Sequence, residues 1–141
     1  MDYANKHKHL DYIQAVINRL AGNSFAVKGW AVTILTALFA LASAASVQNE
    51  VVWLGLLPIF AFWLLDGYFL WQERLFVAKF NEVAEKRETE IDFSMNPRVH
   101  IGGNRKWLSS VFSKTLLVFY LSLIGLCVAI TFFVLPLMEE G

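Results

Sequence analysis

Residues 51–71 read VVWLGLLPIFAFWLLDGYFLW and contain a single charge, Asp66, and this stretch dictates the fold class. A helix rises about 1.5 Å per residue, so about 20 residues cross the roughly 30 Å hydrocarbon core of a bilayer. Two further stretches are long enough, Gly29–Val47 and Thr115–Met138, and neither contains a charged residue. Because a helix satisfies its own backbone hydrogen bonds away from water, we expect an all-α integral membrane protein with three transmembrane helices.

The composition of the chain agrees with a membrane location. Of its 141 residues, 57% are hydrophobic and 17% are charged, with twelve basic and twelve acidic side chains. Soluble domains are about 45–50% apolar and about 25% charged. The balance excludes a disordered chain and a nucleic-acid binder that works through overall positive charge. The single cysteine, Cys127, excludes a disulfide scaffold and is expected to act as a small apolar side chain in the third span.

The basic residues are divided unequally between the two sides of the predicted spans. All twelve precede the first span or lie between the second and third: Lys6, Lys8, Arg19, Lys28, Arg74, Lys79, Lys86, Arg87, Arg98, Arg105, Lys106 and Lys114. Since Lys and Arg are retained on the cytoplasmic side, we expect residues 1–28 and 72–114 to be cytoplasmic and the C-terminus to lie outside. The 28 residues before the first span are too long and too patterned for a cleavable signal peptide.

The chain is predicted to form a single membrane domain with two cytoplasmic helical segments. In residues 1–28, an apolar stripe predicts an amphipathic helix that ends near Ala21–Ser24, before the first span. This helix would lie on the bilayer surface, on its own cytoplasmic neighbours or against another subunit. The stripe consists of Leu10, Ile13, Ile17 and Leu20.

The second predicted span continues beyond the membrane as a helix. No proline lies between Asp66 and Glu90, so we expect the helix to end near residues 87–90. Its apolar stripe needs a partner, either the N-terminal helix or another subunit. The stripe consists of Phe69, Phe76, Phe80 and Val83.

The segment before the third span is predicted to be irregular. Turn signals at Asn96–Pro97 and Gly102–Asn104 indicate either a short hairpin or a plain loop over residues 91–106. A short surface helix is expected over residues 107–113.

Asp66 is the principal candidate site residue, because an ionisable group within a span is unfavourable unless it is paired or functional. In an antiparallel hairpin, Lys28 reaches nearly the same depth, and its long side chain can approach the carboxylate. We therefore predict an intramembrane polar pair of Asp66 and Lys28. The alternatives are a polar contact between subunits and a group that lines an aqueous vestibule.

Rows of small residues predict close helix packing in lipid. The spacing does not distinguish packing within one subunit from packing in a homo-oligomer. The rows are Gly29, Thr33 and Ala37; Thr36, Ala40 and Ala44; and Ser122, Gly125 and Ala129.

Four basic residues beside the spans are predicted to contact anionic lipid, since each contributes about 1 kcal/mol near a charged bilayer. A nucleotide or a nucleic-acid strand is the alternative ligand for the same charges. The residues are Arg98, Arg105, Lys106 and Lys114.

No residue pattern indicates catalysis. His7 and His9 are two apart and do not share a helix face, and His100 is distant in sequence. Gly102–Gly103 lacks the spacing and the lysine of a phosphate-binding loop. We therefore expect neither a catalytic residue, nor a metal, nor a cofactor, and we expect the protein not to be an enzyme.

Two segments carry a resemblance to a known family. Residues 13–25, IQAVINRLAGNSF, followed by Lys28–Trp30, and residues 62–69, FWLLDGYF, followed by QERLF at 72–76, resemble a family of small bacterial multi-pass membrane proteins. More loosely, a two-span hairpin that continues into a cytoplasmic helix resembles SLATT-type and CRISPR-accessory membrane effectors of antiviral defence. The resemblance implies a bacterial inner-membrane location and an oligomer that perturbs the membrane, and it brings no catalytic residue.

Our leading functional hypothesis is a homo-oligomeric inner-membrane pore or membrane-perturbing effector, acting in antiphage defence. Its expected partners are membrane lipids, other copies of the chain, and a cytoplasmic protein or nucleotide signal; nucleic acid is not expected. The alternative is a non-conducting membrane anchor or scaffold that docks a cytoplasmic protein.

Overall fold

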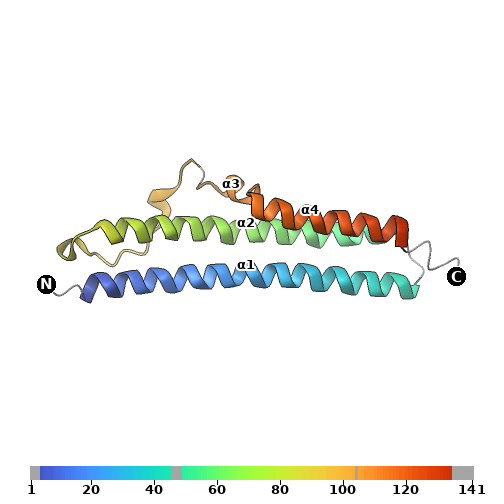
Figure 1. The fold of residues 1–141 in the computed structure, drawn as a ribbon, viewed down its shortest axis with the longest axis horizontal. Helices are drawn as coiled ribbons and strands as arrows, with labels where there is room; N and C mark the ends of the chain where they lie inside the picture. Colours follow the sequence, from blue (N-terminus) through green and yellow to red (C-terminus); the bar gives the residue numbers. More distant parts are fainter. Residues whose placement is uncertain (1–3, 46–48, 104, 135–141) are drawn as a thin grey trace.

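The computed structural model describes residues 4–45, 49–103 and 105–134, which form the helical arrangement drawn in Figure 1. No strand occurs within these ranges. Three helices are long and apolar enough to cross a membrane, which confirms the predicted fold class. They are α1 (Ala4–Ala45), α2 (Asn49–Glu85) and α4 (Lys114–Ala129), which continues as the π-helix η3 (Ile130–Val134). The predicted span ends at residues 46–47 and 135–138, and Asn104 of the predicted turn, lie outside the described residues.

The helix α1 differs from the prediction, because it does not end near Ala21–Ser24 but runs unbroken for 42 residues, or about 63 Å. A glycine inside a helix costs only about 1 kcal/mol relative to alanine. Leu20 and Val27, on either side of Gly22, are both buried, and their packing offsets that cost. The predicted amphipathic helix and the first span are therefore two halves of one helix.

The helix α2 lies antiparallel to α1 along most of its length (Figure 1). It continues beyond the second apolar stretch as predicted, although it ends at Glu85, slightly earlier than expected. Ile13 of α1 and Leu75 and Val83 of α2 are completely buried where the two helices lie side by side. Val83 belongs to the predicted stripe of the α2 extension and is buried in this hairpin, whereas Phe69, Phe76 and Phe80 of the same stripe are only partly buried.

The third helix, α4, packs beside α2 in the half of the molecule that contains the apolar stretches (Figure 1). The ring of Trp63 on α2 stacks on the ring of Tyr120 on α4, with centroids 5.7 Å apart. A Cβ atom at Gly55 of α2 would lie 3.0 Å from Cys127 Sγ on α4 and 3.2 Å from Leu35 Cδ1 on α1. The absence of a side chain at Gly55 therefore lets all three helices meet at this point.

Between α2 and α4 the chain folds back along α2 through two 3-10 turns and a short helix (Figure 1). Of the two predicted alternatives for residues 91–106, the described part shows a loop without strands. The predicted short surface helix is present as α3, and it crosses α2 at Gly67, where an added Cβ would overlap Val111. Trp63 Nε1 fixes the crossing by donating to the Val111 carbonyl at 2.9 Å. The elements are η1 (Glu88–Glu90), η2 (Arg98–His100) and α3 (Trp107–Val111).

Candidate functional site: a buried polar cluster and an exposed small-residue face

A polar cluster joins the three long helices around Asp66, whose side chain is completely buried. Lys28 Nζ of α1 lies 2.6 Å from Asp66 Oδ2, and the Ser24 hydroxyl, also on α1, donates to Asp66 Oδ1 at 2.5 Å. The Tyr120 hydroxyl of α4 is 3.1 Å from Asp66 Oδ2. We call Ser24, Lys28, Asp66 and Tyr120 the Asp66 cluster.

The Asp66 cluster compensates a buried charge within one subunit. The Lys28 ammonium also donates to Ser24 Oγ at 2.8 Å and lies 5.9 Å from the centroid of the Phe119 ring. Removing one partner of a buried ion pair typically costs about 3–5 kcal/mol, because the other charge is left uncompensated. The arrangement therefore holds α1, α2 and α4 together at the level of Asp66.

Two members of the Asp66 cluster were absent from the sequence prediction. Ser24 precedes Lys28 by four residues, so helical periodicity alone places both side chains on the same face of α1. Tyr120 could not be found in this way, because its contact with Asp66 depends on how α4 is rotated against α2. The structure brings Lys28 and Asp66 together within the subunit.

The predicted small-residue rows of α1 do not pack within the subunit. At about 100° per residue, all six of their members fall on one face of the helix, opposite the buried Ala31, Leu35 and Phe39. All six are exposed, and an added Cβ at Gly29 would meet no atom within 4 Å. We call this set the small-residue face: Gly29, Thr33, Thr36, Ala37, Ala40 and Ala44.

The small row of α4 also lies mostly outside the core, since Ser122 and Gly125 are exposed and Ala129 is partly buried. The exposed hydroxyls are satisfied by their own helices. Thr33 Oγ1 donates to the Gly29 carbonyl at 2.9 Å, and Ser122 Oγ donates to the Val118 carbonyl at 2.6 Å. These two hydroxyls are therefore satisfied without a partner from another helix. The row of α4 is flanked on its own face by the exposed side chains of Val118 and Leu126, whereas the face of α1 consists of small side chains.

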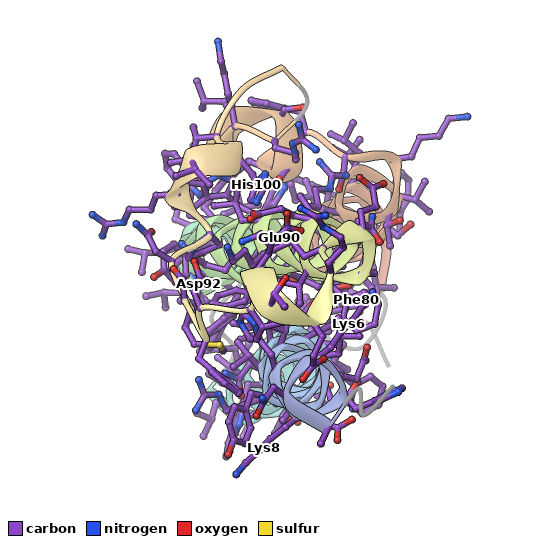
Figure 2. All side chains as sticks on the ribbon, turned by 90° about the vertical axis from the view of Figure 1, so that its left-hand side faces the viewer. Lys6, Lys8, Phe80, Glu90, Asp92 and His100 are labelled. Atoms are coloured by element: carbon purple, nitrogen blue, oxygen red, sulfur yellow. The ribbon has the colours of Figure 1, made fainter. Side chains whose placement is uncertain are left out.

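We call residues 4–28 and 72–114 the basic end, because all Lys and Arg residues of the chain lie there. There the Glu88 carboxylate accepts hydrogen bonds from the backbone N–H groups of Asn5 and Lys6, at 2.9 and 3.1 Å. Lys6 Nζ in turn donates to the Ala84 and Lys86 carbonyls at the end of α2. Figure 2 shows Lys6 on the side of α1 that faces α2, whereas Lys8 points away from the bundle.

A second charged group at the basic end surrounds Glu82, eleven residues beyond Trp71 and outside the predicted membrane-spanning segment. The Glu82 carboxylate lies 3.1 Å from Lys79 Nζ, 2.8 Å from Lys86 Nζ and 2.9 Å from His100 Nε2. Hydrogen bonding to Lys86 is the main reason that the pKa of Glu82 falls from 4.5 to about 2. The contact of His100 with Glu82 ties the η2 turn to α2, and the sequence alone did not predict it.

The four basic residues predicted to contact anionic lipid are all exposed, and they do not form one site. Of these four, only Arg105 lines a cleft of about 300 Å³, together with Arg74 and Asn81 of α2. Within the described part of the chain, none of the four side chains makes an ion pair. The residues are Arg98, Arg105, Lys106 and Lys114.

The three histidines occupy separate positions. His9 is buried, with Nε2 3.2 Å from the Ser94 carbonyl, whereas His7 is exposed and His100 contacts Glu82. Within residues 4–45, 49–103 and 105–134, no three His, Cys, Asp or Glu side chains are grouped so as to hold a metal ion.

No protein-family model, no curated protein and no solved structure matches this sequence. The resemblance to small bacterial membrane proteins and to SLATT-type and CRISPR-accessory effectors therefore stays a prediction. What the protein does must be inferred from the placement of its own residues.

Proposed function

We propose that the protein assembles as a homo-oligomer in a bacterial inner membrane and acts there as a pore or membrane-perturbing effector. The observation that carries this proposal is the small-residue face of α1, which is exposed along the predicted first span. Small residues let helix backbones approach closely, and such packing drives association where lipid supplies no hydrophobic driving force. The small-residue face is therefore best covered by the same face of a second copy of the chain, because both helix backbones can then approach closely.

Over the residues that the structure describes, a single subunit offers no path for water or ions between its helices. The space between α1, α2 and α4 is filled by buried side chains, among them Leu35, Ile59 and Cys127. A pore would therefore form between subunits. It would be lined by uncharged side chains such as Thr33 and Thr36. A narrow pore without charged side chains closes when water leaves its constriction.

The proposed orientation places the basic end in the cytoplasm, because all twelve Lys and Arg residues lie there. The resemblance to antiviral membrane effectors supports a role in antiphage defence, in which a cytoplasmic protein or nucleotide signal acts on the basic end. The expected test is a plaque assay that compares cells carrying the wild-type protein with cells carrying a variant unable to assemble.

The proposal is tested by enlarging one residue of the small-residue face. Ala40→Trp should convert the oligomer to a monomer in nanodiscs and abolish dye leakage from liposomes. The control is Leu64→Trp, because Leu64 is exposed on α2 and lies outside that face. The proposal would be contradicted if the wild-type protein were monomeric at all concentrations. It would also be contradicted if liposomes containing the Ala40→Trp variant still leaked dye.

A second function is favoured by exposed apolar residues outside the spans. Val99 is 73% exposed and Ile101 is 46% exposed, in the loop that leads to α3. In a non-conducting anchor or scaffold, these side chains would dock a cytoplasmic protein. Co-purification of a stoichiometric partner that is lost with Val99→Asp, without any membrane depolarisation on overexpression, would favour this alternative.

A further inference from the structure

A cleft of about 310 Å³ opens between α1, α2 and α4, next to the Asp66 cluster. Its walls are mostly apolar and include Phe25, Leu70 and Leu116, and Lys28 and Glu73 contribute charges of opposite sign. Small-molecule sites typically occupy about 300–1,000 Å³, so the cleft is large enough for the polar part of an amphiphile.

The cleft lies at the level where the three predicted spans meet the basic end. Lys28 immediately precedes the first span, Glu73 follows Trp71 by two residues, and Thr115 is the first residue of the third span. This level corresponds to the headgroup layer of the leaflet that faces the basic end. Anything bound there is exposed to lipid headgroups on one side and to acyl chains on the other.

One part of the cleft suits a phosphate group. An ammonium has three N–H donors, and Lys28 uses two of them, on Asp66 and Ser24, so that the third remains for a ligand. Thr115 and Leu116 belong to the first turn of α4, where backbone N–H groups have no partner within the helix and favour an anion. Lysine and a helix N-terminus therefore contribute positive charge to the same cleft.

Glu73 supplies the opposite charge. Its side chain is partly buried, and within the described residues its carboxylate makes neither a hydrogen bond nor an ion pair. Two cations act on its charge, Arg74 more strongly and Lys28 less strongly. A ligand that carries both an anion and a cation would match Lys28 and Glu73 together, whereas a purely anionic ligand would be repelled by Glu73.

We propose that this cleft binds the headgroup of phosphatidylethanolamine. Its phosphate would contact Lys28 and the first turn of α4, its primary ammonium would pair with Glu73, and its acyl chains would pass over Phe25 and Leu70. The site is independent of the proposed pore, because every residue in it belongs to one subunit.

The test is native mass spectrometry of the full-length protein in detergent, with equimolar phosphatidylethanolamine, phosphatidylglycerol and phosphatidylcholine. We expect one phosphatidylethanolamine per subunit to be retained in preference to the other two lipids. Glu73→Gln should lower this retention about tenfold, to the level of phosphatidylcholine, because a charge-assisted contact to the ammonium is lost. Glu85→Gln is the matched control, because Glu85 is exposed at the end of α2.

A second variant keeps the test informative if Glu73→Gln fails to fold by circular dichroism. Ala21 is exposed and lines the cleft, so Ala21→Trp should fill it and lower the retention of phosphatidylethanolamine without disturbing the core. Equal retention of the three lipids by the wild type would overturn the proposal. So would a preference for phosphatidylglycerol, or retention unchanged by the cleft variant that folds.

Discussion

Lys6 of α1 and Glu88 of η1 join the start of α1 to the end of α2, although they are 82 residues apart in the sequence. The Glu88 carboxylate accepts from the first N–H groups of α1, and the Lys6 ammonium donates to the carbonyls of Ala84, in the last turn of α2, and of Lys86, just beyond it. Each side chain therefore satisfies backbone groups that have no partner within their own helix. The pair closes the basic end of the hairpin and fixes the lengthwise register of α1 against α2.

Loss of the Glu88 cap should weaken this end of the hairpin. Glu88→Gln is expected to lower the free energy of unfolding by about 1 kcal/mol, in line with the loss of a helix N-cap. Hydrogen exchange in the first turn of α1 should become faster, as measured in detergent. Glu85→Gln, an exposed change nearby, should leave both measurements unchanged, and equal effects of the two substitutions would refute the Glu88 cap.

The Lys28–Asp66 pair should show strong energetic coupling. Lys28→Met should lower the free energy of unfolding by about 3–5 kcal/mol, because it leaves Asp66 buried and uncompensated. The double variant Lys28→Met/Asp66→Asn should be destabilised by less than the sum of the single changes. A double-mutant cycle in mild detergent measures this difference. Strictly additive effects would show that the two side chains do not stabilise each other.

Gly67 should be irreplaceable where α3 crosses α2. A Cβ at this position would overlap Val111 Cγ2 and lie 3.1 Å from Val111 Cα, so Gly67→Ala should destabilise the protein by about 1–3 kcal/mol. The matched control is Gly22→Ala in α1, where an added Cβ meets nothing within 4 Å. That change should stabilise α1 by up to about 1 kcal/mol. Chemical unfolding should therefore give changes of opposite sign for the two substitutions.

The Glu82 group should make stability depend on acidity. The pKa of Glu82 is lowered to about 2 in the folded protein, mainly by Lys86. The ionised Glu82 carboxylate therefore contributes fully to the free energy of unfolding above about pH 4.5. The contribution is lost as the pH falls towards 2. Between pH 6 and pH 3 the wild type should therefore lose about 1 kcal/mol more unfolding free energy than Glu82→Gln, after allowance for solvent screening. Parallel pH profiles for the two proteins would contradict this assignment.

The membrane helices could be predicted from sequence because their signal is local. An uninterrupted apolar stretch specifies a span by its length, and the absence of proline after Asp66 indicated that α2 continues. The proximity of Lys28 to Asp66 followed from an antiparallel hairpin, in which equal distances from the connecting turn place residues at similar depth.

The remaining features depend on tertiary packing. The continuation of α1 through Gly22 could not be read from the local turn signals, because burial against α2 outweighs a weak helix breaker. Tyr120 joins Asp66 only through the rotation of α4, and Lys6 meets Glu88 across 82 residues without any periodic pattern. The sequence identified the small-residue rows, whereas only the structure shows that they face away from the core.

The unbroken course of α1 has a mechanical consequence. Residues 4–28 at the basic end and the small-residue face belong to one helix, and no non-helical residue separates them. A movement of the Lys6 end of α1 therefore cannot be absorbed by a flexible joint, and it reaches Ala44 only together with a change at the Lys28–Asp66 pair. In the proposed oligomer, the basic end that receives a signal and the small-residue face that contacts another subunit would belong to one rigid helix, with no hinge between them.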